Sequence, residues 1–529
     1  MVANINFNPI ILNSSHPTQR HHQQIVFDAS VGILESPVEH RAKVIMACGG
    51  GKTLNEHDLI VYGFDKLGHN IQVVVAPSIA LGQQHIETCE GWGLFDKVND
   101  VGWLAFRTGD DDLDEADDKE MTTDPGALIN FIERNKRSCI FTTYKSLEKL
   151  YTTLENSGIT VDAAYYDEFH HLISRQSIDR KKFIETLWPK KNMFFSASEK
   201  CGNIVSSMNK KLFGRKIADV TYRDLRKVGV VTPDVKITMI RRKNLSRILF
   251  DEAEKFLAKS KGVDLDVAIN EGATTIIAQK HMLKTNAHAN FLSFGKSVPV
   301  NSFLNDSLTF KNALLLNTIV NTVNANTSQV DRKNIFNKIK KAQDSILLQY
   351  GIVKEGIDLT AFNAIIIQRG MSAIGIQQAI GRAMRADPAD TKALLEGRIT
   401  LDNPREWVKY YAHVYIVVDD ENDQNYIKAI IEKIVSTGLT RDDFTLQEIA
   451  DQRSGVPPEN LDGLPEIEGT VSDITVQDLN KTVEDYFVDE QNREVAEAAQ
   501  RRIDNEVERI AADVSKMTDK EYIERLLEK

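Results

Sequence analysis

Short apolar runs alternate with helical patterns through the first two-thirds of the chain. Apolar runs of about four to eight residues, bounded by polar residues or glycine, are typical of buried strands. The pattern predicts a first series of strands at Lys43–Ala47, Ile71–Ala76, Val101–Phe106, Ser138–Thr142, Ala163–Asp167 and Met193–Ser196. It predicts a second series at Ala273–Ala278, Leu314–Ile319, Ser345–Tyr350, Ala364–Gln368 and His413–Val418.

Strands separated by helical segments predict parallel sheets with helices on both faces, which is an α/β fold. Because there are two such series, we expect two tandem domains, over residues 1–232 and 233–420, with the break near Gly229–Pro233. After them we expect a helical region at 421–452, a Pro- and Gly-containing linker at 453–470 and an acidic helical tail at 471–529. The tail has one apolar stripe between Val495 and Met517, which would pack on the body of the protein or on a partner helix.

The composition is ordinary for a globular protein, with 42% apolar and 27% charged residues, and 529 residues suit several domains. No window reaches the roughly 18 consecutive apolar residues of a membrane span. The N-terminus has no basic segment before an apolar block, so we expect no secretory signal. Four well-separated cysteines without metal-ligand spacing favour a reduced, intracellular protein, cytoplasmic or associated with the nucleoid.

The net charge of −11 would argue against a nucleic-acid partner if it were spread evenly. It is not, because the segment from Glu421 to Lys529 holds 27 acidic and 13 basic residues. A second acidic segment, Asp110–Glu120, holds eight acids and one lysine, and we expect it to be a surface loop. The rest of the chain is therefore basic, and its Lys and Arg clusters could line a groove that binds phosphates, as well as an ordinary solvated surface.

The most informative segment is Ala47–Thr53, which follows the apolar run Val44–Met46. Glycines followed by Lys and Thr form loops whose backbone N–H groups wrap a phosphate chain. Gly49, Gly50 and Gly51 would allow close approach, Lys52 would reach the outer phosphates, and Thr53 would hold Mg²⁺. Met46 departs from the strict pattern, which has glycine there.

A second constellation, Asp167-Glu168-Phe169-His170-His171, stands at the end of a predicted strand. A carboxylate at the tip of a strand beside a phosphate loop can hold Mg²⁺, which we assign to Asp167. The neighbouring Glu168 can then polarise an attacking water.

Gly-Lys-Thr followed by Asp-Glu-x-His resembles the motor of superfamily 2 helicases, and the other motifs of that family follow in order. The DEAD/DEAH-like resemblance covers about residues 18 to 420 and is closest to the motor subunits of restriction enzymes. The matching segments are Arg20–Gln23 (glutamine motif), Ala76–Ser78 (motif Ia), Thr142–Leu147 (a Thr-Tyr-x-Ser-Leu segment), Ser196–Ser198 (motif III), Glu355–Asp358 (motif V) and Gln378–Arg385 (motif VI).

The resemblance implies two RecA-like domains that bind ATP and Mg²⁺ in the cleft between them. It implies further residues for ATP, namely Gln23 (or Gln24 in the other register), Gly356 and Asp358, with Gln378, Arg382 and Arg385 acting in catalysis from the second domain. Spaced three apart, Arg382 and Arg385 would share one face of a helix. His170 and Gln378 would connect the ATP site to motif III. The resemblance also implies contacts to the nucleic-acid backbone from Pro77, Ser78, Thr142, Thr143, Gln279 and Lys280.

The sequence therefore predicts an ATP-hydrolysing helicase or translocase, with DNA favoured over RNA by the restriction-type motifs. A translocase subunit that moves on duplex DNA in a restriction, defence or repair complex remains an alternative. An RNA helicase and a nucleotide-switched adaptor that binds a protein through the tail are two others.

Overall fold

The structure is a computed structural model of the chain. The structure describes residues 19–93, 101–106, 121–172, 183–187, 189–197, 206–241, 250–283, 288–314, 317–324, 327–350, 362–369, 371, 373–418 and 444–449. In this part of the chain, no helix is both long and apolar enough to span a bilayer.

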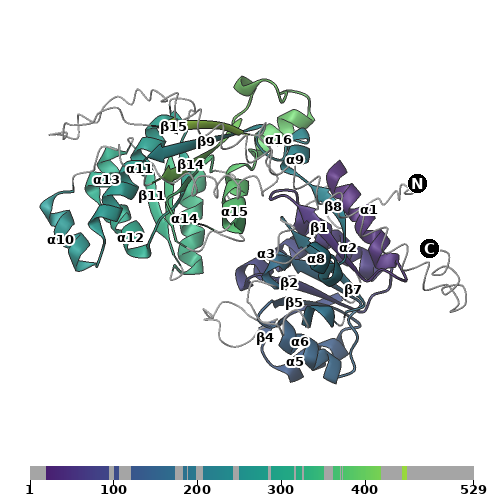
Figure 1. The fold of residues 1–529 in the computed structure, drawn as a ribbon. Helices are drawn as coiled ribbons and strands as arrows, with labels where there is room; N and C mark the ends of the chain where they lie inside the picture. The colour runs from purple at the N-terminus through teal and green to yellow at the C-terminus, as the bar shows by residue number, and fades with distance from the viewer. Residues whose placement is uncertain are drawn as a thin grey trace, which may run out of the picture.

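The described strands form two sheets, one from each half of the chain, and every strand pairing within them is parallel (Figure 1). The first sheet has the order β4 (Met121–Thr122), β3 (Val101–Phe106), β5 (Arg137–Thr143), β2 (Ile71–Ala76), β6 (Ala163–Asp167), β7 (Lys191–Ser196), β1 (Arg41–Met46) and β8 (Arg215–Val220). The second has the order β11 (Ile319–Val323), β12 (Ser345–Gln349), β10 (Asn290–Phe294), β13 (Ala364–Ile367), β14 (Tyr411–Val418), β9 (Asp234–Arg241) and β15 (Phe444–Ile449). These are two tandem RecA-like domains, as the sequence predicts.

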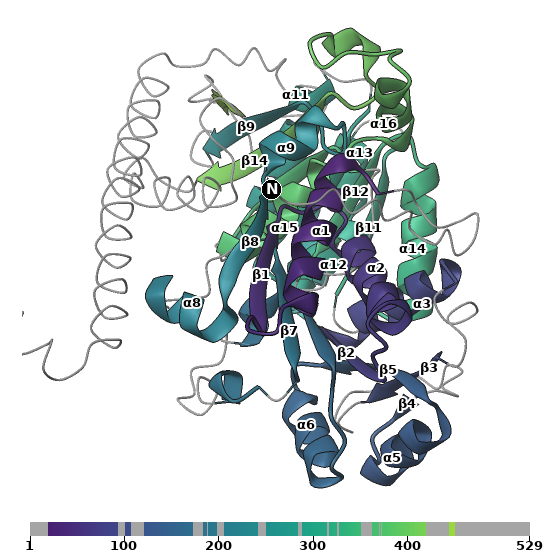
Figure 2. The same cartoon turned by 90° about the vertical axis from the view of Figure 1, so that its right-hand side faces the viewer.

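Helices cover both faces of the first sheet, because its strands are apolar on both sides. One face packs against α1 (His21–Glu35), α2 (Lys52–Asp65) and α3 (Ile79–Gly91). The other packs against α5 (Pro125–Arg134), α6 (Leu147–Asn156) and α8 (Ser206–Phe213). Figure 2 shows α1 and α2 side by side, with α5 and α6 at the far end of the domain.

The second sheet is covered in the same way. One face packs against α10 (Glu252–Ser260), α11 (Leu265–Leu283), α12 (Val298–Asp306) and α13 (Leu308–Ala313). The other packs against α14 (Gln329–Lys341) and α15 (Ala373–Ala383), which is followed by α16 (Pro388–Leu395). Many helices begin where a Ser, Thr or Asp side chain accepts a backbone N–H bond, which stabilises a helix start.

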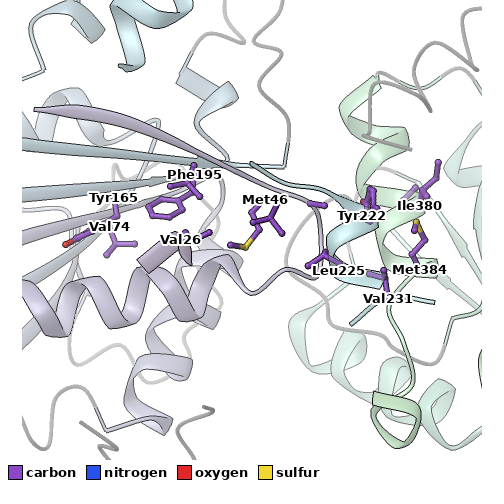
Figure 3. Packing of buried hydrophobic residues seen from close by; sticks show 14 of the residues in the cluster. Val26, Met46, Val74, Tyr165, Phe195, Tyr222, Leu225, Val231, Ile380 and Met384 are labelled. Atoms are coloured by element: carbon purple, nitrogen blue, oxygen red, sulfur yellow. The ribbon is translucent and has the colours of Figure 1, made fainter. Parts of the chain in front are cut away.

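The apolar core is continuous from the first domain to the second. In Figure 3, Tyr222, Leu225 and Val231 lie between Met46 of β1 and the α15 side, where Ile380 and Met384 project toward them. Tyr222 and Leu225 belong to α9 (Tyr222–Lys227), the last helix of the first domain. The two domains are thus packed directly beside the phosphate loop.

The first strand series is confirmed, with β2, β3 and β6 at the predicted residues and β1, β5 and β7 within two residues of them. In the second series β12, β13 and β14 are confirmed, while β11 begins at Ile319, where the predicted strand ends. The pattern missed β4, β8, β9, β10 and β15.

The strand predicted at Ala273–Ala278 is wrong, because these residues form the middle of α11. Ala273, Ile276 and Ala278 are buried there, and the helix contacts α10, α12 and β14. A short run of buried residues without polar spacing reads the same in a buried helix and in a strand.

Part of the region expected to be helical at 421–452 is a strand instead, since Phe444–Ile449 form β15 and pair with β9. The predicted acidic loop at 110–120, the linker at 453–470 and the tail at 471–529 lie outside the described residues. The last strand of the first sheet ends at Val220 and the first of the second begins at Asp234, while the domain boundary at 232/233 stays a prediction.

Candidate nucleotide-binding site

Two glycines of the phosphate loop are held in conformations that other residues rarely adopt. The loop leaves β1 at Met46, and Gly49 and Gly51 have φ angles of +89° and +90°. A Cβ on Gly51 would lie 2.0 Å from Nε2 of Gln23, and a Cβ on Gly50 would lie 2.4 Å from Cγ of Met46. The loop therefore needs glycine here, whereas Met46 is still part of the strand.

Lys52 is the first residue of α2, so the loop delivers the chain directly into a helix N-terminus. The backbone N–H groups at such an end, together with the helix dipole, favour a bound phosphate. A loop that leads from a strand into a helix N-terminus is the setting such a site needs, while the phosphate contacts of Gly49–Thr53 stay a prediction.

The Gln23 side chain is buried under the phosphate loop. Its Oε1 accepts a bond from the Arg20 backbone N–H at 2.8 Å, and its Nε2 donates to the Gly50 carbonyl at 3.1 Å. Gln24, the other register, donates instead to Asp28 on its own helix. Of the two glutamines, Gln23 is therefore the one that contacts the loop.

Lys52 and Glu168 form an ion pair that joins the phosphate loop to the end of β6. Burial works against a charge on Lys52, but the carboxylates of Glu168 and Asp167 outweigh it and raise the pKa of the ammonium group. Burial also works against a charge on Glu168, yet Lys52 and His170 lower the pKa of its carboxyl to about 2. Both groups are thus charged at neutral pH.

Glu168 is held by two further side chains. Ser196 Oγ, at the end of β7, donates to Glu168 Oε2 at 3.1 Å, and His170 Nδ1 lies 3.4 Å from the same oxygen. His170 Nδ1 also lies 3.3 Å from Ser196 Oγ. The contact between His170 and motif III that the sequence suggests is therefore present, and it includes Glu168. The backbone of Glu168 is itself unusual for a residue with a side chain, with φ of 50°.

Asp167 and Thr53 are the residues expected to hold Mg²⁺. Asp167 ends β6, its backbone carbonyl accepts a bond from Tyr144 at 2.5 Å, and its charge is close enough to act on Lys52. Thr53 follows Lys52 in the first turn of α2. A hydroxyl and a carboxylate are hard oxygen donors that suit this ion, which takes its other ligands from water and phosphates. The described residues hold no group of three or more His, Cys, Asp or Glu that could bind a metal by itself.

The second domain reaches the loop through α15. A Cβ on Gly381 would lie 2.4 Å from Cβ of Cys48 and 2.8 Å from the hydroxyl of Tyr222, so only glycine permits this close packing. Gln378 and Arg382 are on this helix and are buried.

Arg385 is not on the same helix face as Arg382, contrary to the prediction, because α15 ends at Ala383. Arg385 instead forms an isolated antiparallel bridge with Val231 of the interdomain segment. This places Arg385 beside Gly49, where an added Cβ would lie 3.9 Å from Cγ of the arginine.

A cleft of about 770 Å³ lies between the domains over the phosphate loop. It is lined from the first domain by Arg20 and Gly49–Thr53 and from the second by Arg385 and residues of α16. Gln23, Asp167, Glu168, Gln378 and Arg382 do not line it in this conformation. Gly356 and Asp358 lie outside the described residues.

Two family models match the chain on the segments that form this site. The Type III restriction enzyme res subunit model matches residues 16–198, and the helicase conserved C-terminal domain model matches residues 275–387. The chain contains a superfamily 2 helicase core. It is of the kind found in restriction-enzyme motors. A search of curated proteins found no match to the chain.

Solved structures share the fold of this helicase core at low sequence identity. The ATP-dependent Type ISP restriction-modification enzyme LlaBIII bound to DNA has a TM-score of 0.61 and 15% identity, over 83% of this chain and 32% of that one. A nuclease-deletion mutant of the Type ISP enzyme LlaGI with a DNA substrate mimic has a TM-score of 0.52 and 16% identity, over 81% and 30%. A fragment of a putative HsdR subunit of a type I restriction enzyme from Vibrio vulnificus YJ016 has a TM-score of 0.50 and 14% identity, over 84% and 72%. The chain thus spans about a third of the length of the two Type ISP enzymes.

Most of the residues expected to contact nucleic acid lie at one edge of the first sheet of the helicase core. Ala76 pairs with Thr143, so Pro77 and Ser78 follow β2 where Thr142 and Thr143 end β5. Thr142 and Thr143 are buried, and Thr142 Oγ1 donates to the Phe106 carbonyl at 3.0 Å.

Gln279 and Lys280 do not follow a strand, which corrects the prediction for this pair. Both are in the last part of α11, and Gln279 is fully buried and donates to Thr318 Oγ1 at 2.8 Å. This placement argues against a phosphate contact from Gln279. The error follows from the strand wrongly predicted at Ala273–Ala278.

The sequence motifs do not include the α16 side of the cleft, where Thr391, Lys392 and Glu396 belong to no motif. They also do not include Lys409, which is buried and contacts the carbonyl of Arg385. A signal was present for Lys409, because a lysine between Trp407-Val408 and Tyr410-Tyr411 is unusual in an apolar run and needs a buried partner.

Proposed function

We propose that this chain binds ATP with Mg²⁺ in the interdomain cleft and couples its hydrolysis to movement along DNA. The observation that carries the proposal is that Glu168 contacts both Lys52 and Ser196, where three neighbouring strands end. Lys52 also lines the interdomain cleft, and Arg385 lines it from the second domain. Phosphate binding, water activation and charge stabilisation in a phosphoryl transfer need a lysine, a carboxylate and an arginine, which are here Lys52, Glu168 and Arg385.

Lys52 is the residue we expect to bind the outer phosphates. It is paired with Glu168 in this structure, so a nucleotide must compete with that carboxylate for the ammonium group. Once Lys52 turns to the phosphates, Glu168 is exposed toward the cleft. Binding of ATP would thus uncover the group that activates water.

Glu168 can serve in that role after Lys52 has moved, because His170 and the bond from Ser196 also lower the pKa of its carboxyl and favour the ionised form, which accepts a hydrogen bond from water. Ser196 and His170 hold its Oε2, which leaves Oε1 for the water when Lys52 has moved. The bond from Ser196 to Glu168 also connects the reaction to the start of motif III.

Thr53 and Asp167 would hold Mg²⁺. The ion would neutralise charge on the phosphates when it is bound. Arg385, and Arg382 after a change in the cleft, would stabilise the negative charge that develops as the terminal phosphoryl group transfers.

Movement on nucleic acid requires that the cleft change between nucleotide states while the strand stays bound across the domains. Pro77 and Ser78 follow β2 at the carboxyl end of the first sheet and are proposed to position the nucleic-acid backbone, together with Thr142 and Thr143 if the nucleic-acid strand displaces the partners of these two buried hydroxyls. DNA as the partner is supported by the Type ISP enzymes of the same fold, whose structures were determined with DNA or a DNA mimic.

The decisive experiment is the ATPase rate of the full chain, titrated with single-stranded DNA, duplex DNA and RNA at several salt concentrations. We expect stimulation by DNA, and a salt dependence that reports the number of phosphate contacts. Lys52→Ala should abolish turnover, while Lys66→Ala, at the exposed end of the same helix, should not. A Lys52→Ala protein that keeps wild-type turnover, or a wild type without ATPase under any of these conditions, would contradict the proposal. Stimulation by RNA alone would assign the substrate to RNA.

Strand separation is distinguished from duplex translocation by a second pair of assays. A helicase displaces one strand of a forked duplex, whereas a duplex translocase removes the third strand of a triplex and leaves the duplex intact.

A further inference from the structure

Lys409 is a buried lysine that joins two segments of the second domain. It lies just before β14, with 7% of its surface exposed. Its Nζ donates to the carbonyl of Phe362 at 2.5 Å and to the carbonyl of Arg385 at 2.7 Å. Phe362 precedes β13 and Arg385 follows α15, so one ammonium group connects the chain just before β13 to the chain just after α15.

The backbone beside Lys409 is fixed from α16. Both oxygens of Asp390, which is itself 2% exposed, accept bonds at 2.8 Å from the backbone N–H groups of Val408 and Lys409. The carboxylate also supplies a negative charge close to the buried ammonium group. Burying a lysine is costly without such partners, so its presence indicates a specific demand for this contact.

The Arg385 segment is held on its opposite side by the interdomain segment. Thr232 N–H donates to the Met384 carbonyl at 2.7 Å, and Ala386 N–H donates to the Val230 carbonyl at 3.1 Å. These bonds tie Arg385 to the chain that leaves the first domain, and Lys409 ties it to the body of the second. The position of Arg385 in the cleft therefore depends on both.

We propose that Lys409 is a positioning residue that holds the backbone of Arg385 so that its guanidinium group reaches the transferring phosphate. This inference rests on the proposed ATPase function and adds a residue that lies outside the helicase motifs identified in the sequence. Lys409 does not line the cleft and acts on the reaction only through Arg385. A charge-assisted bond to a carbonyl is stronger and more directional than a neutral one, which suits the task of fixing a catalytic backbone.

The role predicts an effect on the transition state rather than on nucleotide binding in general. A fixed arginine contributes to binding of ADP with aluminium fluoride, which imitates the transferring phosphoryl group, but little to binding of ADP. Lys409→Met removes the ammonium donor from both carbonyls. Lys409→Arg keeps a charged donor at the same position.

The test is the ratio of the dissociation constants for ADP and for ADP with aluminium fluoride, measured on the full chain with Mg²⁺. We expect Lys409→Met to lower this ratio about tenfold or more, with affinity for ADP unchanged, and Lys409→Arg to restore part of it. Turnover should fall through kcat, with little change in KM. A folded Lys409→Met protein with the wild-type ratio would overturn the inference.

Two further variants separate positioning from loss of stability. Phe303→Leu alters a buried ring in α12, remote from Arg385, and should lower thermal stability while keeping the ratio. Asp390→Asn retains the ammonium group but weakens the hold on its backbone, and should lower the ratio severalfold even if Lys409→Met does not fold. If Lys409→Met does not fold and Asp390→Asn has the wild-type ratio, the bond from Lys409 to the Arg385 carbonyl does not position the arginine, and the inference is overturned. A wild type that hydrolyses no ATP would instead refute the proposed function itself.

Discussion

The role of Glu168 depends on the side chains that surround it. In the sequence it is the second letter of a four-residue motif, but in the structure it contacts a lysine, a serine and a histidine from three separate segments. Lys52 keeps it ionised, while Ser196 and His170 fix one of its oxygens. A residue with this environment can act on a water without a large rearrangement of its own.

Glu168→Gln should keep ATP binding and lose most of its turnover. The amide has nearly the same shape but is a poor base, and such groups contribute about 10² to 10⁴ in rate. Binding of a fluorescent ATP analogue and steady-state ATPase rates would separate the two effects. Wild-type turnover in this variant would contradict the assignment of Glu168 as the residue that activates water.

His413 makes the stability of the second domain depend on pH, independently of the nucleotide-binding site. Burial, with the charge of Lys236 nearby, lowers its pKa to about 3 from the ordinary 6.5. The folded protein thus keeps this ring neutral where the unfolded chain protonates it. Its contribution to stability is complete above pH 6.5 and is lost as the pH falls from 6.5 toward 3.

His413→Phe should therefore flatten the loss of stability in acid. Removing one such group changes the slope of the unfolding free energy by at most about 1.4 kcal/mol per pH unit between these values. Urea unfolding of the wild type and the variant at pH 7, 6 and 5 would measure it. Parallel pH profiles for the two proteins would contradict the lowered pKa.

At the scale of single elements, the phosphate loop lies where β1 ends and α2 begins. The sequence identifies it because glycine, lysine and threonine have local requirements that a short pattern can express. The structure adds the packing that surrounds it, in which Gln23 from α1 lies below Gly51 and α15 approaches Cys48 through Gly381. These contacts come from segments far apart in the sequence.

Gly51→Ala should weaken ATP binding by at least about tenfold, because the new methyl group meets Gln23 and the residue cannot easily keep φ of +90°. Gly68→Ala is the matched control, since Gly68 also has positive φ, +67°, but open space around it. That control should cost about 1 kcal/mol in stability and leave nucleotide affinity intact. Equal nucleotide affinity in Gly51→Ala and the wild type would show that the close packing is unnecessary.

The strand predictions succeeded where strands are short, apolar and bounded by polar residues, as at Ile71–Ala76 and Ala163–Asp167. They failed for Ala273–Ala278, which is buried within a helix, and for Arg215–Val220, where exposed and buried residues are mixed. An edge strand such as β8 has few buried residues, so its hydrophobic pattern is weak.

At the scale of the whole molecule, one apolar core joins the two domains beside the phosphate loop (Figure 3). Val231 and Met384 lie close together in this core. Beside them, Thr232 N–H donates to the Met384 carbonyl and Ala386 N–H donates to the Val230 carbonyl. A nucleotide that moves Arg385 must therefore act on this contact too. The junction between the domains and the site are parts of one structure.

Deleting Thr470–Lys529 should leave basal ATPase activity largely intact, because every described strand and every matched motif precedes this segment. A chain that ends at Val418 should be less stable and aggregate, since it loses β15 and exposes the edge of β9. ATPase rates, thermal unfolding and light scattering would compare the two truncations. Loss of turnover in a folded protein without 470–529 would place the tail in the catalytic unit.

Residues that are neighbours in the chain were enough to predict the helicase family, the phosphate loop, the Asp167-Glu168 pair and most strands. Four features of the site came only from the folded structure: the contact of Glu168 with Ser196, the place of Arg385 beyond the end of α15, the buried state of Gln279 and the bond from Lys409. All of these join residues that are distant in sequence and meet only when two sheets and the segment between them pack together. A linear pattern records which residues are present, but the distances among their side chains follow from how the domains are placed.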